Sequence, residues 1–135
     1  MLIEILDAQG LPHWVTWQGM DSFNDYSGSL GAGAVGPAAL PQVLVPANPA
    51  APGTTGCRCG WLFQNTSQAS MLVSDAPLSQ AGQLTSAYLV PPGGYFPTSN
   101  FPLSTGIIYV QGLNAAGSQA GDTYTCREFV NAGGE

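Results

Sequence analysis

Apolar and polar residues alternate most regularly between positions 57 and 67, in the stretch Cys-Arg-Cys-Gly-Trp-Leu-Phe-Gln-Asn-Thr-Ser. Successive side chains of a β-strand point to opposite faces, so this period of two indicates a strand. Two large aromatic residues on one face predict that the strand packs against the core of a compact β domain. One face carries Cys59, Trp61, Phe63 and Asn65, and the other carries Arg58, Gly60, Leu62 and Gln64.

Further strands are predicted on both sides of this stretch, separated by turns rich in glycine and proline. The last of them places Tyr124, Cys126 and Glu128 on one face, while 106–111 is apolar on both faces, which is typical of a central strand. Residues 95–103 contain two prolines and are expected to form a loop. Without helical periodicity, this pattern predicts an antiparallel sandwich or a small barrel. The predicted strands are 2–6, 14–18, 71–73, 86–90, 106–111 and 122–130.

The composition changes along the chain. Glycine, alanine and proline dominate residues 30–56, so an extended arm or linker is expected there. Its apolar residues favour an arm laid on a neighbouring surface, since a mobile linker would be more polar. We therefore predict an N-terminal β-hairpin segment, an extended arm, a β-sandwich domain and a flexible tail, at residues 1–29, 30–56, 57–130 and 131–135.

Charged residues are rare: they make up 7% of the 135 residues, against about 25% in ordinary soluble proteins. There is no lysine, and two arginines stand against eight acidic residues, for a formal net charge of −6. Binding to nucleic acid or to anionic lipid needs several cations, so we expect neither partner. Little charge combined with 44% hydrophobic residues predicts that other protein covers part of the surface.

No apolar run approaches the length of about 20 residues that a membrane helix needs, and the N-terminus lacks a signal-like block. We therefore expect a chain that is made and used without secretion. Three cysteines, an odd number, favour reduced thiols over a disulfide framework. The triplet Asn65-Thr66-Ser67 matches a glycosylation acceptor, but it needs a secretory route to be used.

Candidate chemistry is sparse. The single histidine, His13, lies in the first predicted turn, where a surface role is expected, because catalysis needs a base with an oriented partner. Structural zinc usually draws on two closely spaced ligand pairs, so buried thiols are preferred over a site made by His13, Cys57, Cys59 and Cys126. A calcium loop is matched only in part, by Asp21, Asn24 and Asp25. We expect no enzyme activity, no catalytic or metal-binding residues and no cofactor.

Two groups of residues are candidates for binding. Because Arg58 and Arg127 are the only cations, we expect each to pair with an acid or with backbone carbonyls, within the chain or across a subunit boundary, although two solvated arginines are the simple alternative. The aromatic candidates Tyr95, Phe96 and Phe101, together with Tyr109 and Tyr124, can line a carbohydrate face, but core or subunit packing is favoured. The candidate partner-interface residues are Trp14, Trp17, Leu40, Val43, Leu44, Val45, Arg58 and Arg127.

Three segments carry a resemblance to a known group of proteins: 60–67 (GWLFQNTS), 90–97 (VPPGGYFP) and 122–129 (DTYTCREF). Together they resemble small β-sandwich structural proteins of tailed bacteriophages. In those proteins a Leu-Phe-Gln-Asn-x-Ser strand is followed by a Pro-Pro-Gly-Gly turn and a closing Thr-x-Arg-Glu strand. The resemblance covers about residues 57–129, with a less specific likeness in 1–25. The motifs are structural, so no active residue is implied.

The resemblance implies a virion component, and it adds a jelly-roll-like topology to the expected antiparallel sandwich. We expect a capsid decoration or cement protein that binds between capsid subunits, assembles in the host cytoplasm, and contacts the major capsid protein or another virion protein. A homo-oligomer, dimer or trimer, is expected as well. The alternative is a head-tail or fibre-associated module that binds a receptor or a glycan.

Overall fold

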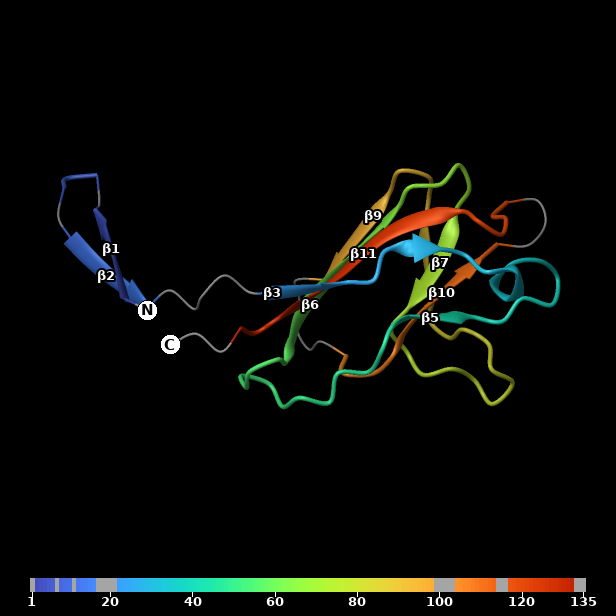
Figure 1. Ribbon diagram of the computed structural model, residues 1–135, viewed down its shortest axis with the longest axis horizontal. Coiled ribbons are helices and arrows are strands. Elements are labelled where there is room, and N and C mark those ends of the chain that lie inside the picture. Colours follow the sequence, from blue (N-terminus) through green and yellow to red (C-terminus); the bar gives the residue numbers. More distant parts are fainter. Residues whose placement is uncertain are drawn as a thin grey trace.

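Figure 1 shows the protein as a computed structural model of the 135-residue chain. The structure describes residues 2–6, 8–10, 12–16, 22–98, 104–113 and 117–132. Within these residues the chain is all-β, and its helix content is a single short 3-10 turn, η1 (Ala32–Ala34). The strands are β1 (Leu2–Leu6), β2 (Pro12–Thr16), β3 (Ser22–Asp25), β4 (Gly28–Ser29), β5 (Gln42–Val45), β6 (Arg58–Asn65), β7 (Met71–Ser74), β8 (Tyr88–Val90), β9 (Tyr95–Thr98), β10 (Ile108–Gly112) and β11 (Thr123–Val130).

The body consists of two antiparallel sheets, which form the two layers in Figure 1. A four-stranded sheet has the order β5-β10-β7-β8. A five-stranded sheet has the order β3-β11-β6-β9, and β4 also pairs with β11. This arrangement agrees with the predicted β-sandwich. The predicted central strand is confirmed as well, because β10 lies between β5 and β7.

The core lies between the two sheets and contains side chains from both. Trp61 and Phe63 project inward from β6, as their alternation predicted, and both are buried. From β11, Tyr124 and Cys126 project into the same core, so the predicted faces of both strands are confirmed. The four-stranded sheet contributes the buried aliphatic and thioether side chains of Leu44, Val45, Met71, Val73, Val90, Ile108 and Val110.

The first two strands pair as the predicted N-terminal hairpin. Strand β1 runs antiparallel to β2, with Leu2 opposite Thr16 and Leu6 opposite Pro12. The second strand begins at Pro12, two residues earlier than predicted. Proline is tolerated at the first position of a strand, where its missing N–H removes no central ladder bond. The turn between the two strands is therefore shorter than predicted.

The division into a hairpin segment, an arm and a domain is wrong at residues 22–56. Strands β3 and β4 pair with β11, and β5 pairs with β10, so these residues complete both sheets. Leu30, which precedes η1, and Ala34, the last residue of η1, are buried in the core. Proline and glycine bound the short elements in this segment without separating them from the body, because each element needs only two to four ladder positions.

Residues 95–98 are also a strand, although a loop was predicted. Strand β9 pairs with β6, with Phe96 opposite Phe63 and Pro97 opposite Leu62. It lies at the end of the five-stranded sheet, where proline is allowed because one side of the strand has no ladder bond to form.

A bulge at the start of β6 changes the side on which Arg58 lies. In the register with β11, Phe129 faces Gly60 and Val130 faces Arg58, so Cys59 is an extra residue in β6. An extra residue reverses the alternation on one side of the bulge. Arg58 is therefore buried, although strict alternation placed it on the face opposite Trp61.

Candidate functional site

The two sheets differ in their charged residues. The strands of the four-stranded sheet, β5, β7, β8 and β10, contain no charged residue. The strands of the five-stranded sheet carry Asp25, Arg58, Arg127 and Glu128. The outward sides of the two sheets therefore differ in charge, and each suits a different kind of contact.

The outward side of the four-stranded sheet is apolar. The ladder places Tyr109 opposite Val43, and it aligns Gln111, Leu72 and Leu89 across three strands. Val43 is 54% exposed and Leu89 61% exposed, while the other three are half-buried. An antiparallel sheet with one solvated side normally carries polar residues there. We call this surface, made of Val43, Leu72, Leu89, Tyr109 and Gln111, the uncharged face.

One end of the uncharged face is bordered by loops. Ser74, which lies opposite Tyr109, is covered, since its hydroxyl donates to the Thr85 carbonyl at 2.6 Å. Tyr109 also helps to line a mainly apolar hollow of about 440 Å³, together with Ile107, Pro77, Ala47, Gly106, Ser104 and Asp75. The hollow extends the apolar surface beyond the strands, and Asp75 is the single charged residue that lines it among the described residues.

Aromatic rings close the side of the sandwich where β8 and β9 lie. The Tyr88 and Phe96 rings stack with centroids 4.3 Å apart, and Phe96 in turn lies 5.3 Å from Trp61. Tyr95, the neighbour of Phe96, is 67% exposed on the opposite side of β9. Of the predicted carbohydrate-binding aromatics, Tyr95 and Phe96 thus lie on different sides of one strand, and Phe101 lies outside the described residues.

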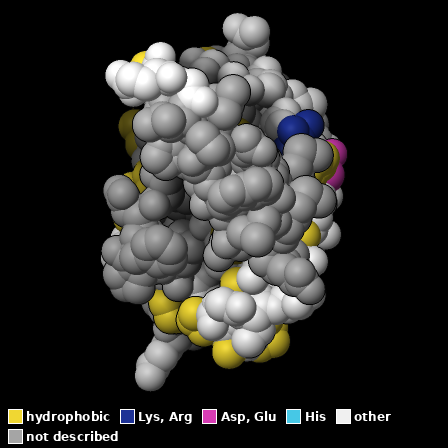
Figure 2. Space-filling model, turned by 90° about the vertical axis from the view of Figure 1, so that its left-hand side faces the viewer, with side chains coloured by type: hydrophobic (Ala, Val, Ile, Leu, Met, Phe, Trp, Pro, Cys, Tyr) yellow, Lys and Arg dark blue, Asp and Glu magenta, His cyan; other side chains and the backbone are white. Residues whose placement is uncertain are grey.

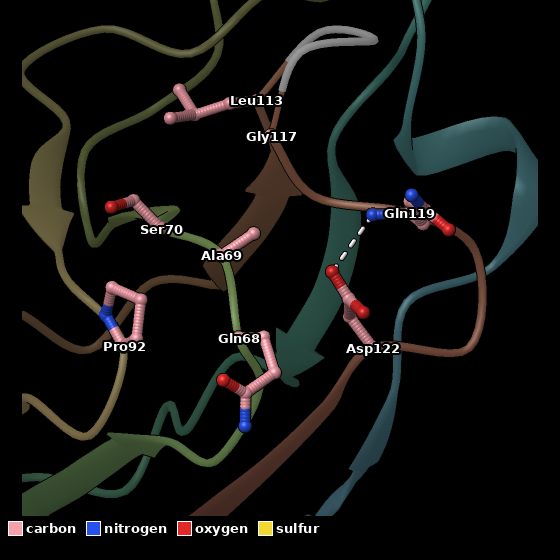
Figure 3. A pocket seen from close by; sticks show the side chains of 8 residues that line it. All are labelled: Gln68, Ala69, Ser70, Pro92, Leu113, Gly117, Gln119 and Asp122. Carbon is pink, nitrogen blue, oxygen red and sulfur yellow. Dashed lines mark hydrogen bonds between the residues drawn. The ribbon is translucent and has the colours of Figure 1, made fainter.

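A second hollow, of about 560 Å³, opens at the end of the sandwich where three loops meet (Figure 3). These loops join β6 to β7, β8 to β9, and β10 to β11. Most of its polar side chains are uncharged, and Asp122 is the single charged residue among those that line it in the described chain. The lining residues are Gln68, Ala69, Ser70, Pro92, Leu113, Gly117, Gln119 and Asp122.

Buried Asn65 holds two of these loops together. Its amide donates to the carbonyls of Ala69 at 2.6 Å and Val90 at 3.0 Å. Its side-chain oxygen accepts from the amide and hydroxyl of Ser67. An asparagine that is fully buried and bonded in this way is not accessible as a glycosylation acceptor in the folded chain.

The Pro-Pro-Gly-Gly turn forms against the same asparagine. The Gly94 amide donates to the Pro91 carbonyl, and Gly93 has a φ of 74°, which glycine adopts readily. The backbone amide of Asn65 donates to the carbonyl of Gly94, and the backbone amide of Gly93 donates to the carbonyl of Asn65. Two motifs that are distant in the sequence are therefore in direct contact.

The third loop is fixed by Ser118 and Asp122. Buried Ser118 donates its hydroxyl hydrogen to the Ser70 carbonyl and accepts from the Leu113 amide at 3.2 Å. The Asp122 carboxylate accepts a hydrogen bond from the backbone amide of Gln119 at 2.7 Å, which is the dashed line in Figure 3. The rim of this hollow is thus held by internal hydrogen bonds, while the side chains of Gln68, Ser70 and Gln119 bond to no other described residue.

Arg58 pairs with an acid and with backbone carbonyls inside the chain, which is one of the two alternatives predicted for it. Its Nε donates to Glu128 at 2.7 Å, and both side chains are almost completely buried. Its Nη groups donate to the carbonyls of Ser104, Gly106 and Pro46 at 2.6 to 2.9 Å. Because the guanidinium group of Arg58 is buried and bonded within the chain, it is not accessible to a partner. The prediction that Arg58 belongs to a partner interface is therefore wrong.

Glu128 also accepts the side-chain amides of Asn24 and Asn48, each at 3.3 Å. Asn24 points inward to this carboxylate, whereas the adjacent Asp25 bonds to Ser27. These bonds hold the pKa of the Asp25 carboxyl below its ordinary value. The partial calcium loop is therefore split between two sides of β3, and Asp21 lies outside the described residues.

Arg127 lies at the surface of the five-stranded sheet, over the Phe23 ring at 4.5 Å from its centroid. On the side of the molecule shown in Figure 2, basic atoms form one small patch, and acidic atoms lie beside it. Asp25 is the partner of Arg127 in the strand register. Arg127 therefore has an aromatic and an acidic neighbour within the chain and is exposed enough to contact another molecule.

The remaining interface candidates divide by burial. Leu44 and Val45 belong to the core and are wrong as contact residues, because β5 is a sheet strand rather than part of an arm. Leu40 and Val43 are each 54% exposed. Trp14 lies in β2, but nothing is described of its side chain, and Trp17 lies outside the described residues.

The three cysteines are reduced thiols, as expected, and form no disulfide. Burial raises the pKa of the Cys126 thiol to about 12, with the nearby carboxylates acting in the same direction. Cys57 and Cys59 lie at the bulge, and Cys126 lies opposite Phe63 further along β6. In the described residues, no three histidine, cysteine or acidic side chains gather as a metal site.

The candidates taken from the sequence do not include the outward residues Leu72 and Leu89, and they include Tyr109 only as an aromatic of the possible carbohydrate face. The available signal was an apolar residue at the outward position of each strand in one sheet, but sequence alone did not show which strands share a sheet.

No helix in the described chain has both the length and the apolar character to cross a membrane. In comparisons with known proteins, no family model, no curated protein and no solved structure matches this chain.

Proposed function

We propose that the chain is a non-enzymatic structural protein of a tailed-bacteriophage virion. Its specific role in this proposal is that of a capsid decoration or cement protein, which binds between capsid subunits and stabilises the head. The partner is the major capsid protein or another virion protein. The chain acts as a homo-oligomer, a dimer or a trimer, and joins the virion in the host cytoplasm.

The uncharged face is the observation that carries this proposal. A surface that presents Val43, Leu89 and Tyr109 to solvent on one sheet is unfavourable for a free monomer. It suits a protein whose work is to lie against other protein subunits. The low charge of the whole chain supports the same conclusion.

A jelly-roll topology is part of the proposal, and the strand order supports it. A jelly roll is a double-sheet fold of eight strands built from two Greek keys. Here β3, β11, β6 and β9 make one sheet and β5, β10, β7 and β8 the other, so that most successive strands alternate between sheets. Viral capsid domains are among the proteins that use this fold, although the fold alone does not decide function.

The motifs that carry the bacteriophage resemblance also support the proposal by their contacts. Asn65 of the first motif bonds to the backbone of the Val90–Gly94 turn of the second. Cys126 and Glu128 of the third lie opposite Phe63 and Trp61 of the first. The shared residues therefore form one connected structural unit, as motifs that preserve a fold would.

Purified particles of a phage that encodes this chain provide the test. Mass spectrometry should find the chain in many copies per particle, and a density map should place it over seams between capsid subunits. Particles that lack the chain should lose head stability on heating or dilution from salt. Absence of the chain from intact particles would contradict the virion role.

A receptor- or glycan-binding module is the second candidate, and the hollow in Figure 3 is what favours it. Amide, hydroxyl and carboxylate groups on a rim fixed by internal hydrogen bonds suit a neutral polyhydroxylated ligand. A glycan array would reveal such binding. Gln119→Ala should then abolish it, whereas Tyr95→Ala should abolish binding if the exposed aromatic surface is used instead. In the particle, this function predicts density at a fibre or tail tip.

A further inference from the structure

We propose that the uncharged face is the contact surface for a second copy of this chain. The inference rests on the homo-oligomer in the proposed function and names the surface that makes it. The two copies would pack their four-stranded sheets against each other through Val43, Leu72, Leu89, Tyr109 and Gln111.

The outward residues of this sheet provide the first argument. Val43 and Leu89 lie on the two edge strands, β5 and β8, and Leu72 and Tyr109 lie on the two strands between them. The apolar surface therefore extends across the full width of the sheet. Side chains from two such sheets pack face to face in sandwiches with their strands aligned within about 30°.

Charge provides the second argument, and it selects a copy of the chain as the occupant. Each molecule carries a net charge of −6, so two copies repel each other at surfaces that present acids. The strands of this sheet carry none of the acids, and Asp75 borders only the hollow at one end. Contact through this face keeps like charges apart.

Symmetry provides the third argument. A two-fold contact uses the same patch on both molecules, so the patch must be complementary to itself. A surface without charge meets this condition, because it has no cation that requires a separate acid across the interface. The outer side of the five-stranded sheet, which presents Arg127 and Asp25, is less suited to such a contact.

The test measures self-association of the purified full-length chain and of charge-inserting variants. Sedimentation velocity and light scattering between about 1 and 100 µM should show concentration-dependent association of the unmodified chain. Leu89→Glu should raise the dissociation constant at least about tenfold, because two buried like charges would face the interface. Val43→Glu, on the other edge strand, should have the same effect.

Phe23→Glu is the matched control. Phe23 is 49% exposed, comparable to Leu89, but it lies on the five-stranded sheet. This variant should associate like the unmodified chain. Thermal melts of all three variants verify that the fold is retained, and Val43→Glu keeps the test decisive if Leu89→Glu fails to fold.

The outcomes separate this inference from the wider proposal. A chain that stays monomeric at 100 µM overturns both the homo-oligomer and the assigned surface. Association that survives Leu89→Glu and Val43→Glu, or that is lost only in Phe23→Glu, overturns the surface but leaves the homo-oligomer standing. Absence of the chain from particles contradicts the virion role and has no bearing on the self-association measured in solution.

Discussion

The two sheets of the sandwich use polar groups in opposite ways. The five-stranded sheet turns Arg58, Glu128 and Asn65 toward the interior, and each of them is bonded there. The four-stranded sheet contributes apolar residues to the core and presents apolar residues outside as well. The first sheet therefore pairs its buried polar and charged groups within the chain, whereas the second leaves an uncharged, largely apolar surface that another molecule can cover. A buried polar network specifies a fold, and an exposed apolar face specifies a contact.

The largest effect is expected when the edge strands are removed from both sheets at once. Deleting residues 1–56 removes β3, β4 and β5 together with buried Leu30, Leu44 and Val45. Each of these side chains contributes about 2 kcal/mol, against a total stability of about 5–15 kcal/mol. We expect an unfolded chain by circular dichroism and NMR. Deleting residues 1–21 leaves both sheets intact and should preserve the fold; a folded 57–135 fragment would restore the interpretation of 30–56 as an arm.

The paired charges of the five-stranded sheet come next. Arg58→Met leaves the Glu128 carboxylate buried without its cation, and we expect a loss of about 3–5 kcal/mol in the free energy of unfolding. Arg127→Met removes an exposed cation and should cost less than about 1 kcal/mol. Denaturant unfolding of both variants measures the difference. Equal losses would show that the two arginines have similar surroundings and would remove the contrast between inside and outside.

Replacing Asn65 tests the polar network at the loop end. Asn65→Ala removes four side-chain hydrogen bonds and leaves the carbonyls of Ala69 and Val90 without this donor. We expect a loss of about 2–3 kcal/mol. The neighbouring Gln64 is exposed, so Gln64→Ala should stay within about 0.5 kcal/mol of the unmodified chain. Faster hydrogen exchange at residues 66–70 and 91–94 should accompany the Asn65 change, and unchanged exchange there would contradict the role assigned to it.

The smallest effect concerns the buried thiol of Cys126. Its pKa rises from an ordinary value of 9.0 to about 12, so its stabilising effect is complete below pH 9 and declines as the pH rises toward 12. Between pH 9 and 10, unfolding free energy should fall by about 1 kcal/mol through this group. Tyr26 and Tyr124, whose pKa values are also raised by burial, act in the same direction at higher pH.

Cys126→Val separates the thiol from the tyrosines. Valine is similar in size and does not ionise, so the variant should show a smaller decrease in stability between pH 9 and 10. Denaturant unfolding at both pH values measures this difference. Identical pH dependence in the two proteins would mean that the thiol is not protected from ionisation by the five-stranded sheet.

Alternation along single strands was a reliable guide where the ladder is regular. It grouped the residues of β11 and of most of β6 into the correct faces, and it predicted that the aromatic face of β6 points to the core, because side-chain direction in a strand depends only on the backbone. It failed for Arg58, because one extra residue at Cys59 reverses direction, and nothing in the sequence marks that bulge. The interpretation of 95–103 as a loop failed at β9, since proline excludes central strands but not edge strands.

The prediction of an arm at 30–56 was wrong because it rested on the proline and glycine content of this segment. Such residues shorten elements and end ladders, but they do not prevent a four-residue strand such as β5 from pairing with β10. Leu44 and Val45 were recognised as apolar residues that need cover. Whether this cover is another molecule or the opposite sheet depends on the path of the chain in space, which local composition does not reveal.

The sequence by itself determined the β class, the aromatic core face of β6, the turn at Pro91–Gly94 and the poverty of charge. These follow from backbone geometry, side-chain chemistry and counting, which are local properties. Only the tertiary structure decided that Arg58 pairs with Glu128, that Asn65 joins two distant loops, and that Val43, Leu72, Leu89 and Tyr109 share one outward face. Each of these depends on which strands become neighbours, and that choice is made by the packing of the whole chain.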